Sequence, residues 1–209
     1  MVRYNFPKYE LELDIPEDVY FPAEDTFFMI DTLELKGDNR LVYEIGGGSG
    51  IISIIFAQRY KKTRFVITDI SITAAKMIQS NCVKNKVTSQ IDVLCTDKLN
   101  AIHHLSPDAI IWNPPYLPVD SETQQLSITE QLQLTGGEKG YEAAYSIIKC
   151  LQKSRVRTSL HIIFSSIAWE KNQLKYFEDC GIKSEIIGEL KLFFEKLYLV
   201  KLVFGDYNE

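Results

Sequence analysis

No run of 18 apolar residues occurs in this 209-residue sequence, so the chain has no candidate for a membrane-spanning helix. Residues 1–5 contain no apolar core of the kind that begins a secretory signal. Cysteine is scarce, and no two cysteines stand in Cys-x-x-Cys spacing. The four are Cys82, Cys95, Cys150 and Cys180. This spacing argues against a zinc site or disulfides and predicts reduced, mostly buried thiols in a cytoplasmic protein.

Histidine is also scarce, and basic residues are outnumbered by acidic ones. The three histidines, His103, His104 and His161, are not spaced as metal ligands, and we expect no metal site. The net charge of −5 argues against tight nonspecific binding of nucleic acid, which needs a basic surface. With 45% hydrophobic and 24% charged residues, the composition is that of a soluble globular protein, and residues 1–209 are predicted to form one domain.

Strand-like and helix-like patterns alternate along most of the chain. The predicted strands cover residues 41–45, 65–68, 91–95, 109–112, 159–165, 182–192 and 196–204, and the predicted helices cover about 24–35, 51–58, 72–84, 141–153 and 173–179. This order predicts an α/β fold with a Rossmann-like, seven-stranded, mostly parallel sheet, helices on both faces and an antiparallel last strand.

Three further segments carry expectations of their own. Residues 1–36 are predicted to form an arm, extended at 9–13, and a helix that contributes to the site. The polar segment 117–136 is predicted to be a long, mobile substrate loop with room for one short helix. The pair Phe193-Phe194 is assigned to the core.

Four polar side chains fall at the ends of the first four predicted strands of the sheet. They are Glu44, Asp69, Asp97 and Asn113. Ligands of open α/β sheets bind outside the carboxyl ends of the strands. Each acid alone is explained equally well as a helix cap or a solvated strand end, but their coincidence predicts a binding site.

Residues 44–50 form a glycine-rich loop after the first of these strands. A dinucleotide fingerprint would need a glycine at position 51, which is Ile51, and no Gly-Lys-Ser/Thr follows to make a phosphate loop. The missing side chains let a ligand lie directly on the backbone. Glu44 would repel a pyrophosphate and hold an ammonium group, so the loop favours S-adenosyl-L-methionine over NAD. Asp69 would then accept from the ribose hydroxyls and Asp97 from the adenine amino group.

Residues 110–116 combine the end of a buried strand with a rigid exit that contains two prolines. The side-chain carbonyl of Asn113 and the main-chain carbonyl of Pro114 can each accept one proton of an NH2 group. Tyr116 offers a face on which a flat amide or base can stack. The segment therefore predicts a site that grips an NH2 nitrogen and aims its lone pair. The alternative is a strand exit that Asn113 merely caps.

The motifs at residues 19–26, 44–50, 68–70, 113–116 and 136–140 together resemble the class I S-adenosylmethionine-dependent methyltransferases, and among them the archaeal and eukaryotic release-factor glutamine methyltransferases (HemK-like family). The resemblance covers residues 19–204. It implies cofactor contacts at Thr26, Glu44, Gly46, Gly48, Gly50, Asp69, Ile70, Asp97, Lys98 and Asn113. It implies catalytic roles for Asn113, Pro114 and Tyr116, and substrate contacts at Tyr20, Pro22, Asn113, Pro115 and Tyr116.

The resemblance also implies a reaction and partners. The reaction is methylation of the glutamine side-chain amide in the Gly-Gly-Gln motif of a peptide chain release factor, in the cytoplasm, with S-adenosyl-L-methionine as donor. A small zinc-binding activator protein is an implied partner. Two alternatives stay open. An adenine N6-methyltransferase acting on RNA or DNA shares the Asn-Pro-Pro-Tyr motif, although the net charge counts against it. A non-catalytic scaffold would be expected to lack Asn113 or Asp69, and both are present.

Overall fold

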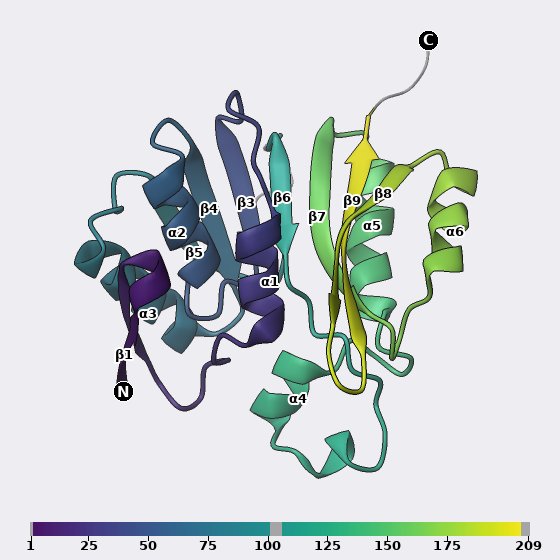
Figure 1. Ribbon diagram of the computed structural model, residues 1–209, viewed down its shortest axis with the longest axis horizontal. Coiled ribbons are helices and arrows are strands. Elements are labelled where there is room, and N and C mark those ends of the chain that lie inside the picture. Colours follow the sequence, from purple (N-terminus) through teal and green to yellow (C-terminus); the bar gives the residue numbers. More distant parts are fainter. Residues whose placement is uncertain (1, 101–105, 206–209) are drawn as a thin grey trace. The chain divides into compact units, whose positions relative to one another are not determined.

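A computed structural model describes residues 2–100 and 106–205 and divides the chain into two compact units, 1–111 and 112–209. The first unit opens with a hairpin and continues as alternating strands and helices (Figure 1). Its elements are β1 (Val2–Phe6), η1 (Pro7–Tyr9), β2 (Leu11–Ile15), α1 (Glu24–Thr32), β3 (Leu41–Ile45), α2 (Ile51–Arg59), β4 (Arg64–Asp69), α3 (Ile72–Lys84) and β5 (Ile91–Cys95). β6 (Ala109–Trp112) follows, with residues 109–111 in the first unit and Trp112 in the second.

The hairpin strands β1 and β2 pair antiparallel in a sheet of their own, whereas β3, β4 and β5 are held together by parallel pairing. β3 pairs with β4, and β4 pairs with β5, both in parallel. β6 begins beside the start of β3, because the Asp108 amide donates to the Leu41 carbonyl at 2.9 Å and the Asp108 carboxylate accepts from the amides of Arg40 and Leu41. All four residues of β6 are buried and apolar, as expected of a parallel strand covered on both faces.

The second unit contains the remaining elements. They are η2 (Thr123–Gln125), α4 (Ile128–Leu134), α5 (Glu142–Ser154), β7 (Thr158–Ser165), η3 (Lys171–Gln173), α6 (Leu174–Asp179), β8 (Lys183–Lys191) and β9 (Lys196–Phe204). β9 pairs antiparallel with both β7 and β8. The full strand order is β5-β4-β3-β6-β7-β9-β8, which confirms the predicted seven-stranded α/β fold with an antiparallel last strand.

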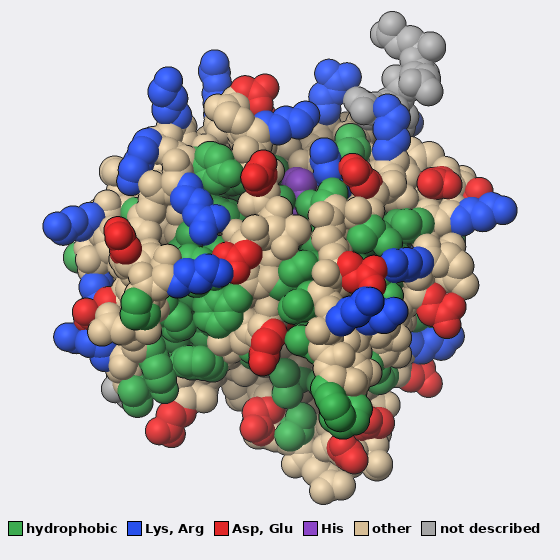
Figure 2. Space-filling model, viewed as in Figure 1, with side chains coloured by type: hydrophobic (Ala, Val, Ile, Leu, Met, Phe, Trp, Pro, Cys, Tyr) green, Lys and Arg blue, Asp and Glu red, His purple; other side chains and the backbone are tan. Residues whose placement is uncertain are grey.

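The prediction that Phe193-Phe194 belongs to the core is wrong. The two side chains are 92% and 89% exposed. They are the central residues of the tight turn between β8 and β9, which the Leu192 amide closes by donating to the Glu195 carbonyl at 2.8 Å. Side chains at the centre of a hairpin turn point away from the sheet, so hydrophobic character alone does not bury them. Figure 2 shows hydrophobic side chains at the surface where Figure 1 draws this hairpin tip.

Two other expectations need correction. Helix α1 ends at Thr32 and not near residue 35, because Leu33 adopts an extended conformation that lets both Leu33 and Leu35 reach the core. The cysteines are free, but they are not mostly buried: Cys95 and Cys150 are exposed, Cys180 is half-buried, and only Cys82 is buried.

The segment 117–136 holds more local structure than a simple loop. It contains η2 and the short helix α4, which Ser127 and Glu130 begin with a reciprocal capping box. Its base is closed where the Leu117 amide donates to the Leu134 carbonyl at 2.9 Å and the Gly136 amide donates to the Leu117 carbonyl at 3.0 Å. The mobility of this segment stays a prediction.

Across residues 2–100 and 106–205, no helix combines the length and the apolar character needed to cross a bilayer. The same residues contain no group of three or more His, Cys, Asp and Glu side chains placed to hold a metal ion. His161 is buried in β7, whereas His103 and His104 lie outside the described residues.

Candidate functional site

The glycine loop after β3 owes its course to residues without a side chain. Gly46, Gly48 and Gly50 have φ values of 64°, 54° and 79°, in the left-handed region where glycine is the favoured residue. Gly50 is the N-cap of α2, and its amide donates to the Gly47 carbonyl at 2.7 Å. The loop therefore ends in the first turn of a helix, where backbone N–H groups lack helical partners.

Gly47 has a role that the sequence analysis missed. A Cβ atom at this position would lie 2.2 Å from Cγ2 of Ile67, so only glycine lets the loop pack against β4. By contrast, a Cβ at Gly48 would meet nothing closer than the Tyr20 carbonyl at 4.0 Å. Packing thus requires Gly47, while the open space beside Gly48 is available to a ligand. The sequence offered no signal for this difference, because it depends on the atoms that surround each glycine in the fold.

Asp69 ends β4 and braces the glycine loop. Its Oδ2 accepts from the Gly48 amide and its Oδ1 from the Ser71 amide, both at 2.9 Å. Burial raises the pKa of this carboxyl group, while the backbone donors act in the opposite direction. Each carboxylate oxygen can accept more than one hydrogen bond, so Asp69 retains capacity for the hydroxyl groups of a ribose.

Glu44 lies in the interior, 2% exposed, and faces the start of α2. Its Oε2 accepts from the Ser53 amide at 3.0 Å, which satisfies one of the free N–H groups of the first helical turn. Burial raises the pKa of Glu44 to about 7, with a smaller contribution from the charge of Asp69. The side chain predicted to hold an ammonium group is therefore also a structural brace between β3 and α2.

The segment before α1 lies next to this loop. The Tyr20 hydroxyl donates to Oδ2 of Asp25 at 2.9 Å, and the Thr26 amide and hydroxyl both donate to Oδ1 of the same carboxylate. Asp25 and Thr26 are buried, as is Pro22. Asp25 thus fixes two predicted site residues, Tyr20 and Thr26, although it was not among the predicted site residues itself.

The remaining cofactor candidates follow β4 and β5. The Thr96 amide donates to the Asp69 carbonyl at 2.8 Å. Asp97 is the next residue in the chain, so it directly follows a residue that contacts Asp69. Asp97 forms an ion pair with Lys98 at 2.9 Å, and both side chains are accessible. Ile70 is 62% exposed and presents an apolar surface beside these groups. An exposed isoleucine next to a carboxylate suits the flat, partly polar adenine ring.

These observations bear on whether S-adenosyl-L-methionine fits the first unit. The glycine loop leaves open space beside Gly48, Asp69 and Asp97 supply acceptors, and Ile70 supplies an apolar surface. No basic side chain contacts the loop in the hydrogen bonds and ion pairs of the described residues, in keeping with a ligand that lacks a pyrophosphate. The donor set therefore fits this cofactor.

Asn113 begins the second group of candidate residues, in the second unit. Its Oδ1 atom is buried, and no group among the described residues 2–100 and 106–205 donates a hydrogen bond to it. Pro114 is buried, and Pro115 and Tyr116 are half-buried. A buried carbonyl oxygen without a donor costs free energy of about 1–3 kcal/mol, so such atoms are uncommon unless a ligand uses them.

The glycines of residues 136–140 have a structural explanation in the second unit. A Cβ at Gly136 would lie 2.1 Å from the Gly140 carbonyl oxygen and 2.5 Å from that of Pro115. A Cβ at Gly140 would lie 2.4 Å from the Tyr116 carbonyl oxygen. The glycine turn therefore packs backbone against backbone on the proline exit and fixes its course.

The predicted site residues thus fall into two groups. The first unit brings together Tyr20, Pro22, Thr26, Glu44, the glycine loop, Asp69, Ile70, Asp97 and Lys98. The second unit holds residues 113–116 with their glycine turn. Along the chain, β6 connects the groups, since Asn113 directly follows its last residue.

Comparison with known proteins assigns the chain to a family. Residues 24–137, more than half of the chain, match the family model for the methyltransferase small domain. A provisionally named protein N5-glutamine methyltransferase of Methanocaldococcus jannaschii is 32% identical over 194 residues, which cover 91% of this chain and 94% of that relative. The release factor glutamine methyltransferase of Dictyoglomus turgidum is 34% identical over 114 residues, which cover 52% of this chain and 40% of that protein.

Solved structures agree with this assignment. A chain of the E. cuniculi Mtq2–Trm112 complex, described as responsible for methylation of the eRF1 translation termination factor, matches with a TM-score of 0.65 and 25% identity over 89% of this chain and 98% of that chain. The catalytic domain of human METTL16 with an RNA hairpin has a TM-score of 0.70 at 17% identity, over 97% and 77%, which shows the fold alone. The chain belongs to the methyltransferase small-domain family.

Proposed function

We propose that this chain is an S-adenosyl-L-methionine-dependent methyltransferase that acts on the glutamine side-chain amide in the Gly-Gly-Gln motif of a peptide chain release factor. The observation that carries the proposal is the buried Oδ1 of Asn113, an acceptor without a donor in the described residues, at the start of a rigid proline exit. The relative from M. jannaschii, matched over nearly the full length of both chains, supports glutamine as the substrate side chain.

The chemistry follows from the low nucleophilicity of an amide nitrogen. Its lone pair is delocalised into the carbonyl, so the protein has to raise electron density on nitrogen and aim it. In the proposed reaction, the side-chain carbonyl of Asn113 and the main-chain carbonyl of Pro114 accept one N–H bond each. Tyr116 stacks on the planar amide. These contacts strengthen as positive charge develops on nitrogen, and they therefore favour the transition state over the bound substrate.

The cofactor would supply an electrophilic methyl group on a sulfonium, and the first unit would hold it. In this proposal the backbone of residues 46–50 carries the amino-acid portion, Asp69 binds the ribose and Asp97 binds the adenine amino group. Thr26, Ile70 and Lys98 would make further contacts with the cofactor. No base has to remove a proton before transfer, because the methylated nitrogen is acidic and releases its proton afterwards. The main task of the protein is then positioning.

An adenine N6-methyltransferase is the second candidate, because RNA-binding structures share the fold. Their identity is too low to support a substrate. The net charge of −5 gives little attraction to a phosphate backbone. The relatives from M. jannaschii and D. turgidum carry glutamine or release-factor names. A release factor as substrate would also place the reaction in the cytoplasm.

A partner protein is a further part of the proposal. The E. cuniculi relative is solved as a complex with a second chain. We propose that a small zinc-binding activator protein binds the present chain as well. The activity measurement below is therefore made with and without a candidate activator.

The substrate is tested by transfer of a tritiated methyl group. Purified chain is incubated with labelled donor and either release factor or total RNA, with and without the activator. We expect label in the release factor and its loss when the glutamine of Gly-Gly-Gln is replaced. Label in RNA alone would establish the adenine reading and overturn this one.

Asn113 provides the sharpest test of the mechanism. Asn113→Ala should lower the single-turnover rate by about 100-fold or more, the scale seen when one positioned transition-state contact is removed. Asn113→Asp keeps an acceptor and should retain more activity than alanine. The fold and most of the cofactor affinity should persist in both variants. If Asn113 only capped the strand exit, both would lose thermal stability while the rate per folded molecule stayed unchanged.

A further inference from the structure

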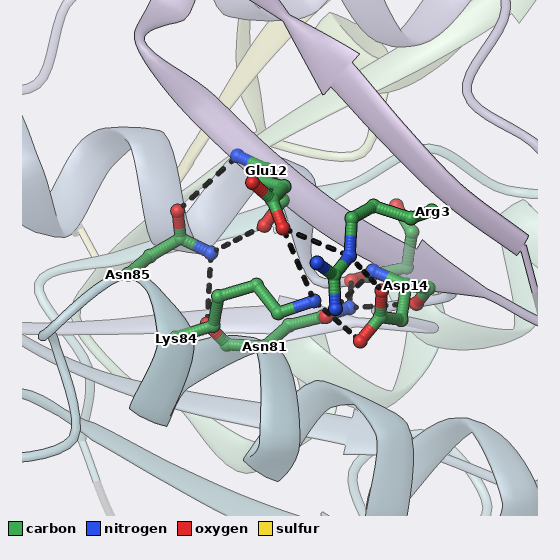
Figure 3. Close-up of polar contacts among 7 residues, drawn as sticks. Arg3, Glu12, Asp14, Asn81, Lys84 and Asn85 are labelled. Atoms are coloured by element: carbon green, nitrogen blue, oxygen red, sulfur yellow. Dashed lines mark hydrogen bonds and ion pairs between the residues drawn. The ribbon is translucent and has the colours of Figure 1, made fainter.

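Two asparagines of α3 bind the N-terminal hairpin. Their side-chain amides make the backbone hydrogen bonds that a neighbouring strand would otherwise make with the edge of β2. The Asp14 amide donates to Oδ1 of Asn81 at 3.0 Å, and Nδ2 of Asn81 donates to the Asp14 carbonyl at 3.1 Å. Asn85 makes the same pair of contacts with Glu12, at 3.4 and 2.9 Å (Figure 3). The outer edge of β2 is therefore satisfied by side-chain amides.

The spacing of the two elements makes this arrangement possible. Residues two apart in a strand are about 6.6 Å apart along its axis. Residues four apart in a helix are about 6.0 Å apart along theirs. Asn81 and Asn85 therefore match the repeat of Glu12 and Asp14. Lys84, between them, forms ion pairs with both acids of β2, and Arg3 of β1 forms ion pairs with the same two acids (Figure 3).

Asn81 differs from Asn85 in one contact. Its Nδ2 also donates to the Ser49 carbonyl at 3.2 Å, inside the glycine loop. Ser49 lies between Gly48, whose amide binds Asp69, and Gly50, which starts α2. The Ser49 carbonyl belongs to the peptide between Ser49 and Gly50, so this hydrogen bond from Asn81 helps to fix the backbone of the glycine loop. No hydrogen bond of Asn85 reaches the loop in the described residues.

Burial makes the link energetically strong. Asn81 is completely buried, and one amide group serves both the hairpin and the loop. If the hairpin separated from α3, the amide would lose two of its three partners in a place where an unpaired polar group is costly. The side chain would then be free to shift away from Ser49.

We propose that Asn81 is a positioning residue that couples docking of the β1–β2 hairpin to the geometry of the glycine loop, so that affinity for S-adenosyl-L-methionine depends on the hairpin. The cofactor part rests on the proposed function. By linkage, the dependence runs both ways, and bound cofactor should also hold the hairpin in place.

The matched variants are Asn81→Ala and Asn85→Ala, because both remove two backbone contacts to β2 and only the first removes the contact to Ser49. We expect Asn81→Ala to weaken cofactor binding about tenfold or more in titration calorimetry. Asn85→Ala should change it less than about threefold, for a comparable loss of melting temperature. Equal changes in affinity for the two variants, or no change for Asn81→Ala, would overturn the proposal.

Hydrogen exchange supplies a readout that does not depend on activity or on a variant that folds poorly. In the wild-type chain, cofactor should slow amide exchange in residues 11–15 as well as in 46–50. In Asn85→Ala, cofactor should still slow amide exchange at both segments. In Asn81→Ser, the slowing by cofactor should be smaller at residues 11–15 and unchanged at residues 46–50. Absence of protection at 11–15 in the wild-type chain would contradict the coupling.

The two proposals fail in different ways. If the wild-type chain does not bind the cofactor, the proposed function fails. The coupling between the hairpin and the glycine loop is then tested without cofactor. Amide exchange of residues 46–50 should be faster in Asn81→Ser than in Asn85→Ala. Equal exchange in the two variants would overturn the coupling alone.

Discussion

At the residue scale, the acidic side chains of the site have two tasks at once. Asp69 accepts a hydrogen bond from the Gly48 amide of the glycine loop, and Glu44 accepts one from a backbone amide of α2. The sequence placed both at strand ends and predicted ligand contacts. It could not show that each also holds the local backbone in place, because the partners are backbone N–H groups, which every residue except proline carries. A carboxylate in such a position gives the loop a fixed shape before any ligand arrives.

Glu44 should give the stability of the chain a measurable pH dependence. Its folded-state pKa is about 7, against an ordinary value of 4.5, so the contribution is full below 4.5 and is lost as the pH rises through 7. The loss amounts to about 3 kcal/mol of unfolding free energy. Glu44→Gln should lack this loss in urea titrations followed by far-UV circular dichroism between pH 4.5 and 8. The exposed Glu17→Gln is the control and should keep the wild-type slope. A Glu44→Gln slope equal to wild type would refute this account.

At the element scale, most of the fold could be predicted from hydrophobic pattern and glycine position. The bounds of α3, β5, β6 and β9 agree with the structure to the residue, because each is a continuous apolar or amphipathic run with clear ends. The first strand of the hairpin was missed. Its five residues are exposed or half-buried and so carry no core pattern. What orders them is the pairing with β2 and the asparagines of α3, which are contacts between distant parts of the sequence.

The candidate site was predictable to a similar extent. Strand ends located Glu44, Asp69, Asp97 and Asn113, since the chemistry of open sheets gathers there. Asn81 could not be found in this way. A buried asparagine inside a helix looks unfavourable from propensity alone, and its value appears only when Asp14 and Ser49 are in place.

The glycine turn of residues 136–140 predicts a specific weakness in the second unit. Gly136→Ala would place a methyl group against two backbone carbonyl oxygens, which cannot move without shifting the proline exit. We expect a loss of about 1–3 kcal/mol in unfolding free energy, the usual range for overpacking, and a lower methyl-transfer rate. Gly37→Ala is the matched control, because a Cβ there meets nothing within 4 Å. Thermal melts and single-turnover rates on both variants test this, and equal behaviour would contradict the packing argument.

At the scale of the whole molecule, the two compact units carry buried titratable groups of opposite effect. His161 lies in β7 of the second unit, where burial, and then the charge of Lys201 opposite it on β9, lower its pKa to about 4. Its ordinary value is 6.5. A depressed pKa means that the stability contribution is full above 6.5 and is lost as the pH falls through 4. Glu44, in the first unit, acts with the opposite sign over an overlapping range.

The histidine should therefore dominate acid unfolding of the second unit. We expect His161 to account for about 3 kcal/mol of lost stability between pH 6.5 and 4, and His161→Gln to remove that slope. Tryptophan fluorescence is the suitable probe, because both tryptophans, Trp112 and Trp169, belong to this unit. Lys201→Met removes the neighbouring charge and should reduce the slope without abolishing it, since burial remains the larger cause. Urea titrations at pH 4.5, 5.5, 6.5 and 7.5 compare slopes and not absolute stabilities, so the packing cost of each substitution cancels. A His161→Gln chain that still loses stability in acid as steeply as wild type would show that another group carries the effect.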